Sequence, residues 1–489
     1  MKVSLIPFFA PDVIHPGTSR PIFPFFLNYQ LTFLPATPPQ YTRSATNTEK
    51  LRIEMNFRIM TYRAALLQSA WLAVIIITVS GCILEGTHYE TEPAVQPPES
   101  FLLSWQSDPT TTMTIDWYPI PGTEASLAYR TRGEEQWQSV SGLTVPVPGI
   151  DRSFQRTELG DLQPDQRYEF RFDGSDSIYQ FRTMPDRLTR PIRFVAAGDM
   201  LHRVGWMRNT AQSVMRIDSE GELDFAVIGG DLAYADGEAR KVGRWFDYFR
   251  IWTEEMITSD NRVIPHVAAI GNHEIKRGYI YNYLPHEHQH PDFVRNEAPY
   301  FSTFIPFPGS DAYDVLDFGD YLSLFLLDSG HASFIKGDQT DWLRRAMYER
   351  GHVRHLIPVY HVPAWPSARD FDDFLGSEVR NYWVPLFEKY GVRVAFENHD
   401  HAYKRTHPIR EGEIDESGIH YIGDGAWGVS TRQIHTDEDD NRPWYLAEAD
   451  TLRHFIMGEI DGDIIRLNMY DEDARPIDEV IITAGFSSP

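Results

Sequence analysis

Five short polar blocks between residues 198 and 401 each end or closely follow an apolar run, and this pattern constrains the fold most. The runs cover residues 192–197, 225–228, 263–270, 321–327, 356–360 and 392–396, and the blocks are Gly198-Asp199, Gly230-Asp231-Leu232-Ala233-Tyr234, Gly271-Asn272-His273-Glu274, His361 and His399-Asp400-His401. Short, continuous apolar runs are typical of strands buried on both faces. Loops at the carboxyl ends of such strands open onto a common crevice. We therefore predict a layered α/β domain over residues 190–484 in which the five blocks converge, with a β-hairpin at residues 455–470.

A second domain is expected in front of it, because 489 residues exceed the roughly 250 to 300 at which one core stops growing. Residues 113–117 and 126–130 alternate between apolar and polar side chains, as half-buried strands do. The segment 162–172, which contains Tyr168, resembles the tyrosine corner of fibronectin type III sandwiches. We predict a small all-β, fibronectin III-like domain over residues 98–184 with a structural or positioning role.

The only cysteine, Cys82, ends a segment with the layout of a signal peptide. Arg58 and Arg63 precede an apolar run over residues 64–79, and small residues then lead into the cysteine. The sequence Val79-Ser80-Gly81-Cys82 resembles the lipobox of bacterial lipoproteins, in which the cysteine is lipidated. We interpret residues 60–82 as a signal peptide with a lipobox; the alternative is an uncleaved membrane anchor or a transmembrane helix.

Residues 1–59 precede the place where such a signal peptide would begin the protein. The segment is rich in Pro and Phe and shows no helical or strand periodicity. We interpret it as a disordered, non-native upstream extension, with Met55 or Met60 as the true start; an unusual N-terminal extension is the alternative. A polar linker over residues 83–97 would join the lipidated cysteine to the β domain.

The chain is acidic, since 45 Lys and Arg against 70 Asp and Glu give a formal net charge of −25. Binding to nucleic acid through long-range attraction is therefore not expected. Phosphate binding is not excluded by this charge, because bound cations are the largest local charges in a metal site.

The five blocks contain the ligand types that a two-cation hydrolytic site needs. Two cations about 3.5 to 4 Å apart can activate water and hold the attacking and leaving oxygens of a phosphate ester. They require a bridging carboxylate and a mixed shell of oxygen and imidazole ligands. The candidate ligands are Asp199, Asp231, Tyr234, Asn272, His361, His399 and His401.

The blocks resemble those of the calcineurin-like metallophosphoesterase superfamily and, within it, those of the purple acid phosphatases. The resemblance covers roughly residues 98–484 and implies a four-layer αββα metallophosphoesterase sandwich behind the fibronectin-like domain. By analogy, a ferric ion would be bound by Asp199, Tyr234 and His401, a divalent ion (Fe, Zn or Mn) by Asn272, His361 and His399, and Asp231 would bridge the two. His273 would lie over the phosphate as a proton donor or transition-state stabiliser.

Tyr234 favours the purple branch, because many other members of the superfamily place a histidine two residues after the first aspartate. That position is Leu201 here, which cannot coordinate a metal, and His202 would point to the other face of an extended segment. Tyr234 would fill the vacant place, and a phenolate is a hard ligand that suits Fe(III).

Two departures from the family pattern bear on the loops. Asn398 stands where the family has glycine before His399, and asparagine tolerates the positive φ that we expect there. Residues 362–367 contain no histidine, whereas plant-type enzymes carry additional histidines after the position of His361 that help to bind the ester and protonate the leaving group. His273 or a histidine from elsewhere would have to do that work.

The resemblance implies an acid phosphatase-type phosphomonoesterase that works by in-line attack of a metal-bound hydroxide on phosphorus. Its substrate would be a phosphorylated small molecule or surface group, and its location the cell envelope, on the membrane surface or in the periplasm, through a lipid anchor at Cys82. One alternative is a Mn- or Zn-dependent phosphodiesterase or nucleotidase on the same scaffold. Another is a noncatalytic surface lipoprotein with a structural metal site.

Two further groups of polar residues have less specific interpretations. The cluster His286-Glu287-His288-Gln289-His290 could form a third metal site, but a solvated active-site rim in a polar loop is favoured. Lys404 and Arg405, which follow His401, are expected to be framework residues rather than substrate clamps.

Overall fold

The computed structural model describes residues 100–309, 312–436 and 441–484. The predictions for residues 1–59, 60–82 and 83–97, Cys82 among them, lie outside these ranges. Among the described residues, no helix is long and apolar enough to cross a membrane.

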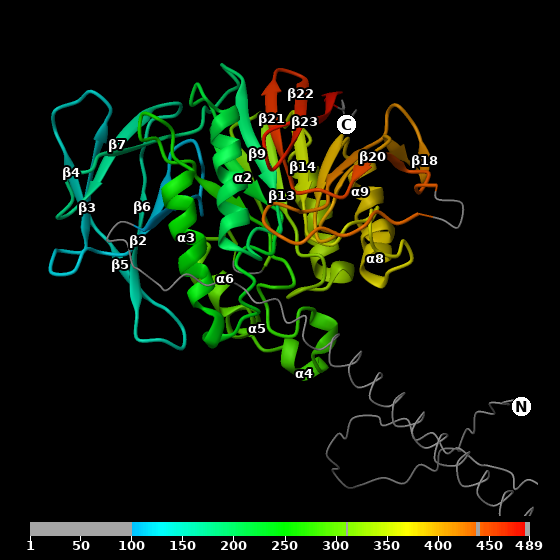
Figure 1. The fold of residues 1–489 in the computed structure, drawn as a ribbon, viewed down its shortest axis with the longest axis horizontal. Coiled ribbons are helices and arrows are strands. Elements are labelled where there is room, and N and C mark those ends of the chain that lie inside the picture. Colours follow the sequence, from blue (N-terminus) through cyan, green and yellow to red (C-terminus); the bar gives the residue numbers. More distant parts are fainter. Residues whose placement is uncertain (1–99, 310–311, 437–440, 485–489) are drawn as a thin grey trace, which may run out of the picture. The chain divides into compact units, whose positions relative to one another are not determined.

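Residues 101–182 form an all-β sandwich of two four-stranded sheets (Figure 1). One sheet has the order β1-β2-β6-β5 and the other β4-β3-β7-β8. The strands are β1 (Phe101–Ser104), β2 (Met113–Trp117), β3 (Ser126–Thr131), β4 (Gln138–Ser141), β5 (Leu143–Pro146), β6 (Ser153–Leu159), β7 (Arg167–Phe172) and β8 (Tyr179–Arg182). The hydroxyl of Tyr168 accepts a hydrogen bond of 2.8 Å from the backbone N–H of Gln163. The predicted β domain and its tyrosine corner are therefore both confirmed.

Two larger mixed sheets form the centre of the second domain. The six-stranded sheet has the order β11-β10-β9-β21-β22-β23 and contains β9 (Ile192–Ala197), β10 (Phe225–Ile228), β11 (His266–Ala268), β21 (His454–Asp461), β22 (Ile464–Asp471) and β23 (Pro476–Thr483). The seven-stranded sheet has the order β12-β13-β14-β15-β19-β16-β20 and contains β12 (Asp314–Phe318), β13 (Leu322–Leu326), β14 (His355–Val359), β15 (Val394–Glu397), β16 (Tyr403–Thr406), β19 (His420–Gly423) and β20 (Leu446–Asp450). A short pair, β17 (Ile409–Arg410) and β18 (Glu413–Ile414), lies apart.

Helices cover the outer faces of both sheets (Figure 1). The helices α2 (Val204–Ile217) and α3 (Gly243–Glu255) pack on the six-stranded sheet, whereas α7 (Thr340–Glu349), α8 (Phe374–Tyr382) and α9 (Val384–Lys389) pack on the seven-stranded one. Three short helices, α4 (Pro285–His288), α5 (Phe293–Glu297) and α6 (Pro299–Phe304), lie in the connection between β11 and β12. The order of layers is α, β, β, α, as predicted.

Successive side chains of a strand point to opposite faces of the sheet. Each central strand is buried on both faces, because the other sheet covers one face and helices cover the other. In β9, Phe194 faces the other sheet and packs edge-to-face against Phe396 at a ring distance of 5.9 Å, whereas Val195 faces the helices. The strand predicted at residues 263–270 is shorter than expected, because Pro265 has no N–H to donate to a ladder. The predicted C-terminal hairpin is confirmed as β21 and β22.

The β sandwich shares its core with the α/β domain. Trp105 packs against Phe225 and Phe318 at ring distances of 6.3 and 5.7 Å. Arg190 binds Asp165 of the sandwich at 3.0 Å and Asp224 of the α/β domain at 2.8 Å. These contacts are those expected of a structural domain.

Candidate metal centre

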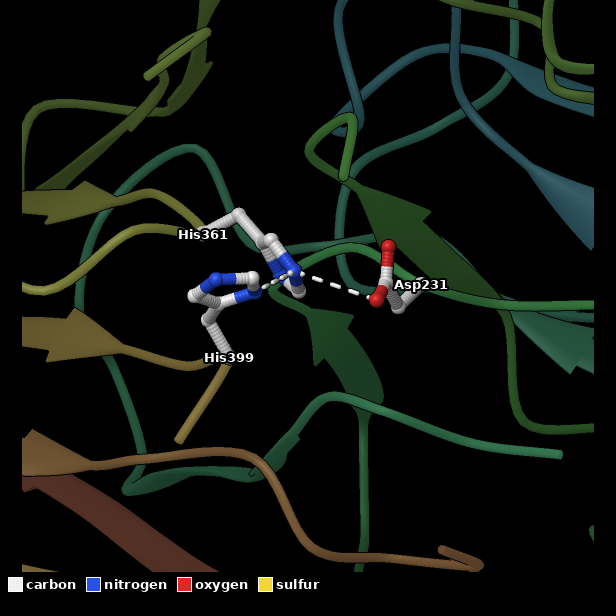
Figure 2. Close-up of side chains that lie close together, drawn as sticks. All are labelled: Asp231, His361 and His399. Atoms are coloured by element: carbon white, nitrogen blue, oxygen red, sulfur yellow. Dashed lines mark hydrogen bonds and ion pairs between the residues drawn. The ribbon is translucent and has the colours of Figure 1, made fainter. Parts of the chain in front are cut away.

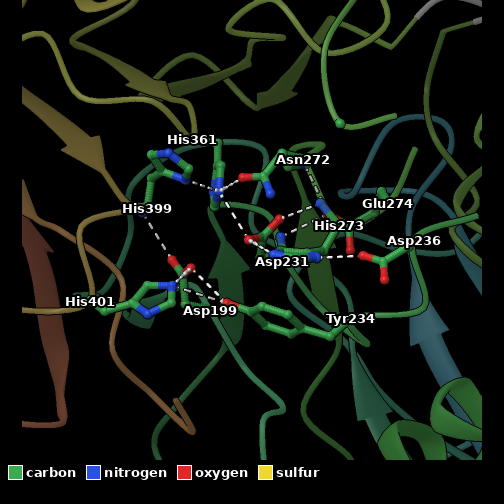
Figure 3. A network of polar contacts seen from close by, with 12 residues as sticks. Asp199, Asp231, Tyr234, Asp236, Asn272, His273, Glu274, His361, His399 and His401 are labelled. Carbon is green, nitrogen blue, oxygen red and sulfur yellow. Dashed lines mark hydrogen bonds and ion pairs between the residues drawn. The ribbon is translucent and has the colours of Figure 1, made fainter. Parts of the chain in front are cut away.

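The five polar blocks lie together at the carboxyl ends of parallel strands (Figure 3). Strands β9, β10 and β11 run parallel in one sheet, and β14 and β15 run parallel in the other. Each of these strands leads into one block, so that side chains as distant in sequence as Asp199 and His401 come within 2.9 Å of each other. The predicted convergence of the blocks is confirmed.

One group of candidate ligands consists of Asp231, His361 and His399, all buried (Figure 2). The Nε2 atom of His361 lies 3.2 Å from Oδ2 of Asp231 and 3.1 Å from Nδ1 of His399. Asn272 completes this side, since its Oδ1 atom lies 3.2 Å from the same Nε2 atom. Four donor atoms therefore surround one small volume.

A second group consists of Asp199, Asp231 and His401, also buried. The hydroxyl of Tyr234 lies 2.9 Å from Oδ1 of Asp199 and 3.2 Å from Nε2 of His401. Asp231 belongs to both groups, so that its carboxylate stands where a ligand shared by two cations would stand.

These separations fit the coordination of cations. Two ligand atoms that each lie about 2.1 Å from one cation, at right angles, are about 3 Å apart. The separations between 2.9 and 3.2 Å match that value on both sides of Asp231. The mixture of carboxylate, phenol, amide and imidazole suits a transition metal better than Mg²⁺ or Ca²⁺.

Backbone carbonyls hold two of the histidines in the orientation that a ligand needs. The Nδ1–H group of His361 donates to the carbonyl of Gly229 at 2.9 Å, and that of His401 donates to the carbonyl of Ser430 at 3.1 Å. Each bond leaves Nε2 as the acceptor that faces the centre, as is common for metal-binding histidines. His399 faces the centre with Nδ1, and its Nε2 atom lies 3.4 Å from the hydroxyl of Tyr279.

The ligand loops hold non-glycine residues in the left-handed region. Asp199, Asp231, Tyr234, His399 and His401 have φ between 55° and 77°. Such conformations cost about 1 to 3 kcal/mol each and cluster at functional sites. All five residues lie in the loops that follow β9, β10 and β15.

The expectation for Asn398 was wrong: the positive φ falls on His399 and not on Asn398. The side chain of Asn398 instead donates to the carbonyl of Tyr360 at 2.9 Å. It also occupies the space where a Cβ at Gly198 or Gly229 would stand. The two glycines therefore make room for a side chain that bridges the sheets.

The expectation for His202 was also wrong. Its ring lies 4.4 Å from the ring of Tyr234 and 5.4 Å from that of His401. The chain is not extended here, because Asp199 turns it and α2 begins at Val204. Leu201 is buried in the helix-covered core and offers no ligand, as expected.

Burial and charge set the protonation of the centre. Burial raises the pKa of Tyr234 well above its usual value, and the carboxylates of Asp199 and Asp231 raise it further. Burial lowers the pKa of His361, but the charges of Asp231 and Asp199 outweigh it and bring the pKa to about 9. The centre therefore attracts positive charge, either as protons or as cations.

His273 lies at the edge of the centre. Its backbone N–H donates to Oδ1 of Asp231 at 2.8 Å, and its ring lies 4.3 Å from that of Tyr234. Nδ1 of His273 lies 2.5 Å from Oδ1 of Asp236, whose other oxygen binds Lys241. Burial lowers the pKa of His273, but Asp231 and Asp236 raise it above its usual value. The structure thus places an imidazole of raised pKa beside Asp231, the carboxylate that both candidate ligand groups share.

Several supporting residues were not assigned a role from the sequence. Glu274 is buried and accepts the backbone N–H groups of Asp231, Leu232 and Gly271 at 2.7 to 2.8 Å. The position of Glu274 in the third block was the only feature of the sequence that indicated a supporting role for it. Tyr279 lies in a loop without a readable motif, and nothing in the sequence indicated its contact with His399.

The two remaining clusters differ in their outcome. Residues 285–288 form the short helix α4 and not a loop. Among the described residues, both groups of potential metal ligands include Asp231, and neither includes His286, His288 or His290. Lys404 is fully buried between Glu397 and Asp424, and Arg405 binds Asp478 at 2.6 Å. Lys404 and Arg405 thus have the contacts of framework residues.

Comparisons with known proteins agree with this geometry. Residues 98–183 match the family described as purple acid phosphatase, N-terminal domain, and residues 192–403 match the calcineurin-like phosphoesterase family. Purple acid phosphatase 18 of Arabidopsis thaliana is 27% identical over 309 residues, which cover 61% of this chain and 63%, less than two thirds, of that protein. Acid phosphatase type 7 of Mus musculus is 26% identical over 428 residues, which cover 78% of this chain and 90% of that protein.

The fold has a solved counterpart. The structure of a purple acid phosphatase from yellow lupin (Lupinus luteus) seeds superposes with a TM-score of 0.63 at 17% identity, over 79% of this chain and 74% of that one. An N-terminal β domain, a four-layer α/β domain and the converging ligand blocks occur in one chain. The chain therefore carries the N-terminal domain of the purple acid phosphatases at residues 98–183, followed by a calcineurin-like phosphoesterase domain at residues 192–403.

Proposed function

We propose that the chain is an acid phosphatase-type phosphomonoesterase that hydrolyses its substrates with two bound cations. The observation that carries this proposal is the position of Asp231 in both candidate ligand groups. Two cations bridged in this way would neutralise charge on the phosphoryl group and supply a water molecule of lowered pKa.

The ligand types support a ferric ion on one side. We assign Asp199, Tyr234 and His401 to Fe(III), and Asn272, His361 and His399 to a divalent Fe, Zn or Mn ion. The buried phenol of Tyr234 is costly to ionise, so it requires a strongly charged cation in place of its proton. A phenolate is a hard ligand, which favours a trivalent ion there.

The chain's own residues supply orientation and a proton. Asp236 holds the ring of His273 through Nδ1, which leaves Nε2 toward the bridging carboxylate, 3.9 Å from Oδ2 of Asp231. In this place His273 would donate a hydrogen bond or a proton to an oxygen of the bound phosphoryl group. General acid help of this kind is typically worth roughly 10² to 10⁴-fold in rate.

The iron assignment is tested by the colour and metal content of the purified protein. The oxidised wild-type protein should contain iron and show a visible tyrosinate-to-iron absorption band, and Tyr234→Phe should lose the band. The matched control is Tyr248→Phe, because Tyr248 is equally buried and its hydroxyl has no hydrogen-bond partner in the described structure. A colourless, iron-free but active wild-type enzyme would contradict the ferric assignment and favour a Mn- or Zn-dependent phosphodiesterase or nucleotidase.

Hydrolysis itself is tested by removing the shared carboxylate. Asp231→Asn should lose both metals and more than about 100-fold in kcat/KM, because changes outside the ligand set already cost 10 to 100-fold. A wild-type protein that hydrolyses no mono- or diester with any metal would instead be the noncatalytic lipoprotein.

We also propose that the protein is exported and anchored in the cell envelope by a lipid on Cys82, where it acts on phosphorylated small molecules or surface groups. The support is the order of basic, apolar and small residues in the sequence over residues 58–82. Radiolabelled palmitate should enter the wild-type protein and not Cys82→Ala. Equal labelling of both proteins would exclude this anchor.

A further inference from the structure

His202 lies in the loop that follows the first ligand block, and the proposed reaction gives it no role. Its ring lies 4.4 Å from that of Tyr234 at an angle of 75°, and 5.4 Å from that of His401 at an angle of 77°. Both neighbours belong to the proposed ferric side. Among the described residues, neither group of potential metal ligands includes His202. Its place is therefore that of a neighbour of two ligands and not that of a ligand.

The loop that carries His202 is tied to the segment 427–430. The backbone N–H of Gly428 donates to the carbonyl of Asp199 at 3.1 Å, and the backbone N–H of His202 donates to the carbonyl of Gly428 at 2.9 Å. The two segments approach so closely that a Cβ at Gly428 would overlap the carbonyl of Met200. The backbone therefore keeps His202 beside the centre.

Ser430 binds two imidazoles at once through its backbone. Its N–H donates to Nδ1 of His202 at 3.1 Å, and its carbonyl accepts the Nδ1–H of His401 at 3.1 Å. A ring nitrogen that accepts a hydrogen bond carries no proton, so the proton of the His202 imidazole is on Nε2. One residue thus sets the orientation of both rings.

The phenol ring of Tyr234 is packed against two imidazoles. Besides His202, the ring of His273 lies 4.3 Å from it at an angle of 35°. The hydroxyl reaches Oδ1 of Asp199 at 2.9 Å and Nε2 of His401 at 3.2 Å (Figure 3). This oxygen lies at the far end of a side chain that rotates about two bonds, so its position depends on what packs against the ring. The two imidazoles hold the phenol among the other ligand atoms of this side.

We propose that His202 is a positioning residue of the ferric side: its ring holds Tyr234, and its Nδ1 atom, through Ser430, holds His401. This inference rests on the proposed ferric assignment. A neighbour that orients a ligand raises metal affinity, because the ligand loses less freedom when the metal binds. It also affects the visible band, because the overlap between a phenolate and iron depends on how the ring is turned toward the metal. A side chain that only fills space would have neither effect.

Three substitutions separate the two contacts of His202. His202→Phe keeps a ring against Tyr234 but removes the acceptor for the N–H of Ser430. His202→Asn keeps an acceptor close to the position of Nδ1 but removes the ring. His202→Ala removes both. The three variants should therefore differ in what they lose, which a general loss of packing does not predict.

The readouts are the tyrosinate-to-iron band of the oxidised protein and its affinity for Fe(III), measured by competition with a chelator. His202→Asn and His202→Ala should shift the band away from its wild-type position, because the ring that orients Tyr234 is gone. His202→Phe should leave the band close to that position. Affinity should fall about 10 to 100-fold in His202→Ala, as is typical of changes outside the ligand set, and by smaller factors in the other two variants.

His420 provides a matched control. It is a half-buried histidine whose Nδ1–H donates to the carbonyl of Thr406 at 3.3 Å. It begins β19, which runs parallel to β15, so it lies at the end of these strands opposite to the ligand block that follows β15. His420→Ala should change neither the band nor the affinity. Thermal unfolding of every variant shows whether it is folded, and if His202→Ala is not, the phenylalanine and asparagine variants decide.

Two results would overturn the role of His202. One is a band and an affinity that stay unchanged in His202→Ala, and the other is an equal shift of the band in His202→Phe and His202→Asn. A wild-type protein that shows no band would overturn the ferric assignment, and this inference with it. The two failures are distinguishable, because only the second is seen in the wild-type protein.

Discussion

The ring of His273 is held by Asp236, whose Oδ1 atom lies 2.5 Å from Nδ1. The second oxygen of this carboxylate binds Lys241, and the backbone N–H of Asp236 donates to the carbonyl of His273 at 2.8 Å. Asp236 comes two residues after Tyr234, so one turn of chain supplies both a candidate ligand and the partner of the candidate acid. The pKa of His273 therefore depends on a carboxylate in the loop directly after the second block.

Replacing Asp236 by Asn should move the pH profile of the enzyme. Burial lowers the pKa of His273, and Asp231 and Asp236 together raise it, so the loss of one carboxylate lowers it. A group that acts in its protonated form is active below its pKa and loses activity as the pH rises through it. The alkaline limb of the kcat/KM profile should therefore shift to lower pH in Asp236→Asn, while Asp292→Asn, at an exposed position, leaves it in place. An unshifted alkaline limb would mean that His273 is not the acid.

The sequence was sufficient to predict the fold and the convergence of the ligand blocks. The apolar runs before Asp199, Asp231 and His399 are short and continuous, which indicates strands buried on both faces. Loops at the carboxyl ends of such strands open onto one crevice, which predicts that the blocks lie together. The β sandwich was predictable for a similar reason, since Tyr168 lies in a recognisable turn and strand.

The path of the chain inside each block was not predictable. The side-chain direction at His202 was predicted on the assumption that this segment is extended. The left-handed turn at Asp199 shows that the segment is not extended. The same limit applies at His399, where the turn is displaced by one residue from Asn398. Contacts between distant loops, such as that of Arg432 with His399, have no sequence signal because they depend on how several loops pack together.

Lys404 is predicted to be essential for stability. Its ammonium group is fully buried and lies 2.5 Å from Glu397 and 2.9 Å from Asp424. Lys404→Met leaves two buried carboxylates without a cation, which should lower the free energy of unfolding by about 3 to 5 kcal/mol. The measurement is urea denaturation of the wild-type and variant proteins.

The loss should depend on pH in a defined direction. Burial raises the pKa of Asp424 well above its usual value, and Lys404 is the group that lowers it most. A carboxyl with a raised folded pKa costs stability as the pH rises through that pKa. The destabilisation of Lys404→Met should thus be larger at pH 8 than at pH 5. Arg405 lies on the same strand as Lys404 and forms a partly exposed pair with Asp478 of β23, so Arg405→Met should cost less.

Glu274 is predicted to support metal binding without touching a metal. Its Oε2 atom accepts the N–H groups of Asp231 and Gly271, and its Oε1 atom accepts that of Leu232. In Glu274→Gln an NH₂ group must face at least one of these donors, which loosens the loop that carries Asp231. Metal affinity should fall about 10 to 100-fold, measured by competition with a chelator. Glu287→Gln, a partly exposed carboxylate that accepts the backbone N–H of Leu284, is the control and should bind metal like the wild type.

Gly425 is predicted to be irreplaceable because of its distance to a candidate ligand and not because of its conformation. It has a φ of +59°, and a Cβ added there would overlap Oδ2 of Asp199. Gly412 has a φ of +79°, but nothing lies within 4 Å of the position that a Cβ would take there. Alanine at either position costs about 1 to 2 kcal/mol in backbone strain, so the pair of variants shares that loss of stability. Gly425→Ala should additionally lose iron and phosphatase activity, whereas Gly412→Ala should keep both. Full iron content in Gly425→Ala would show that Asp199 is not held in place by this close contact.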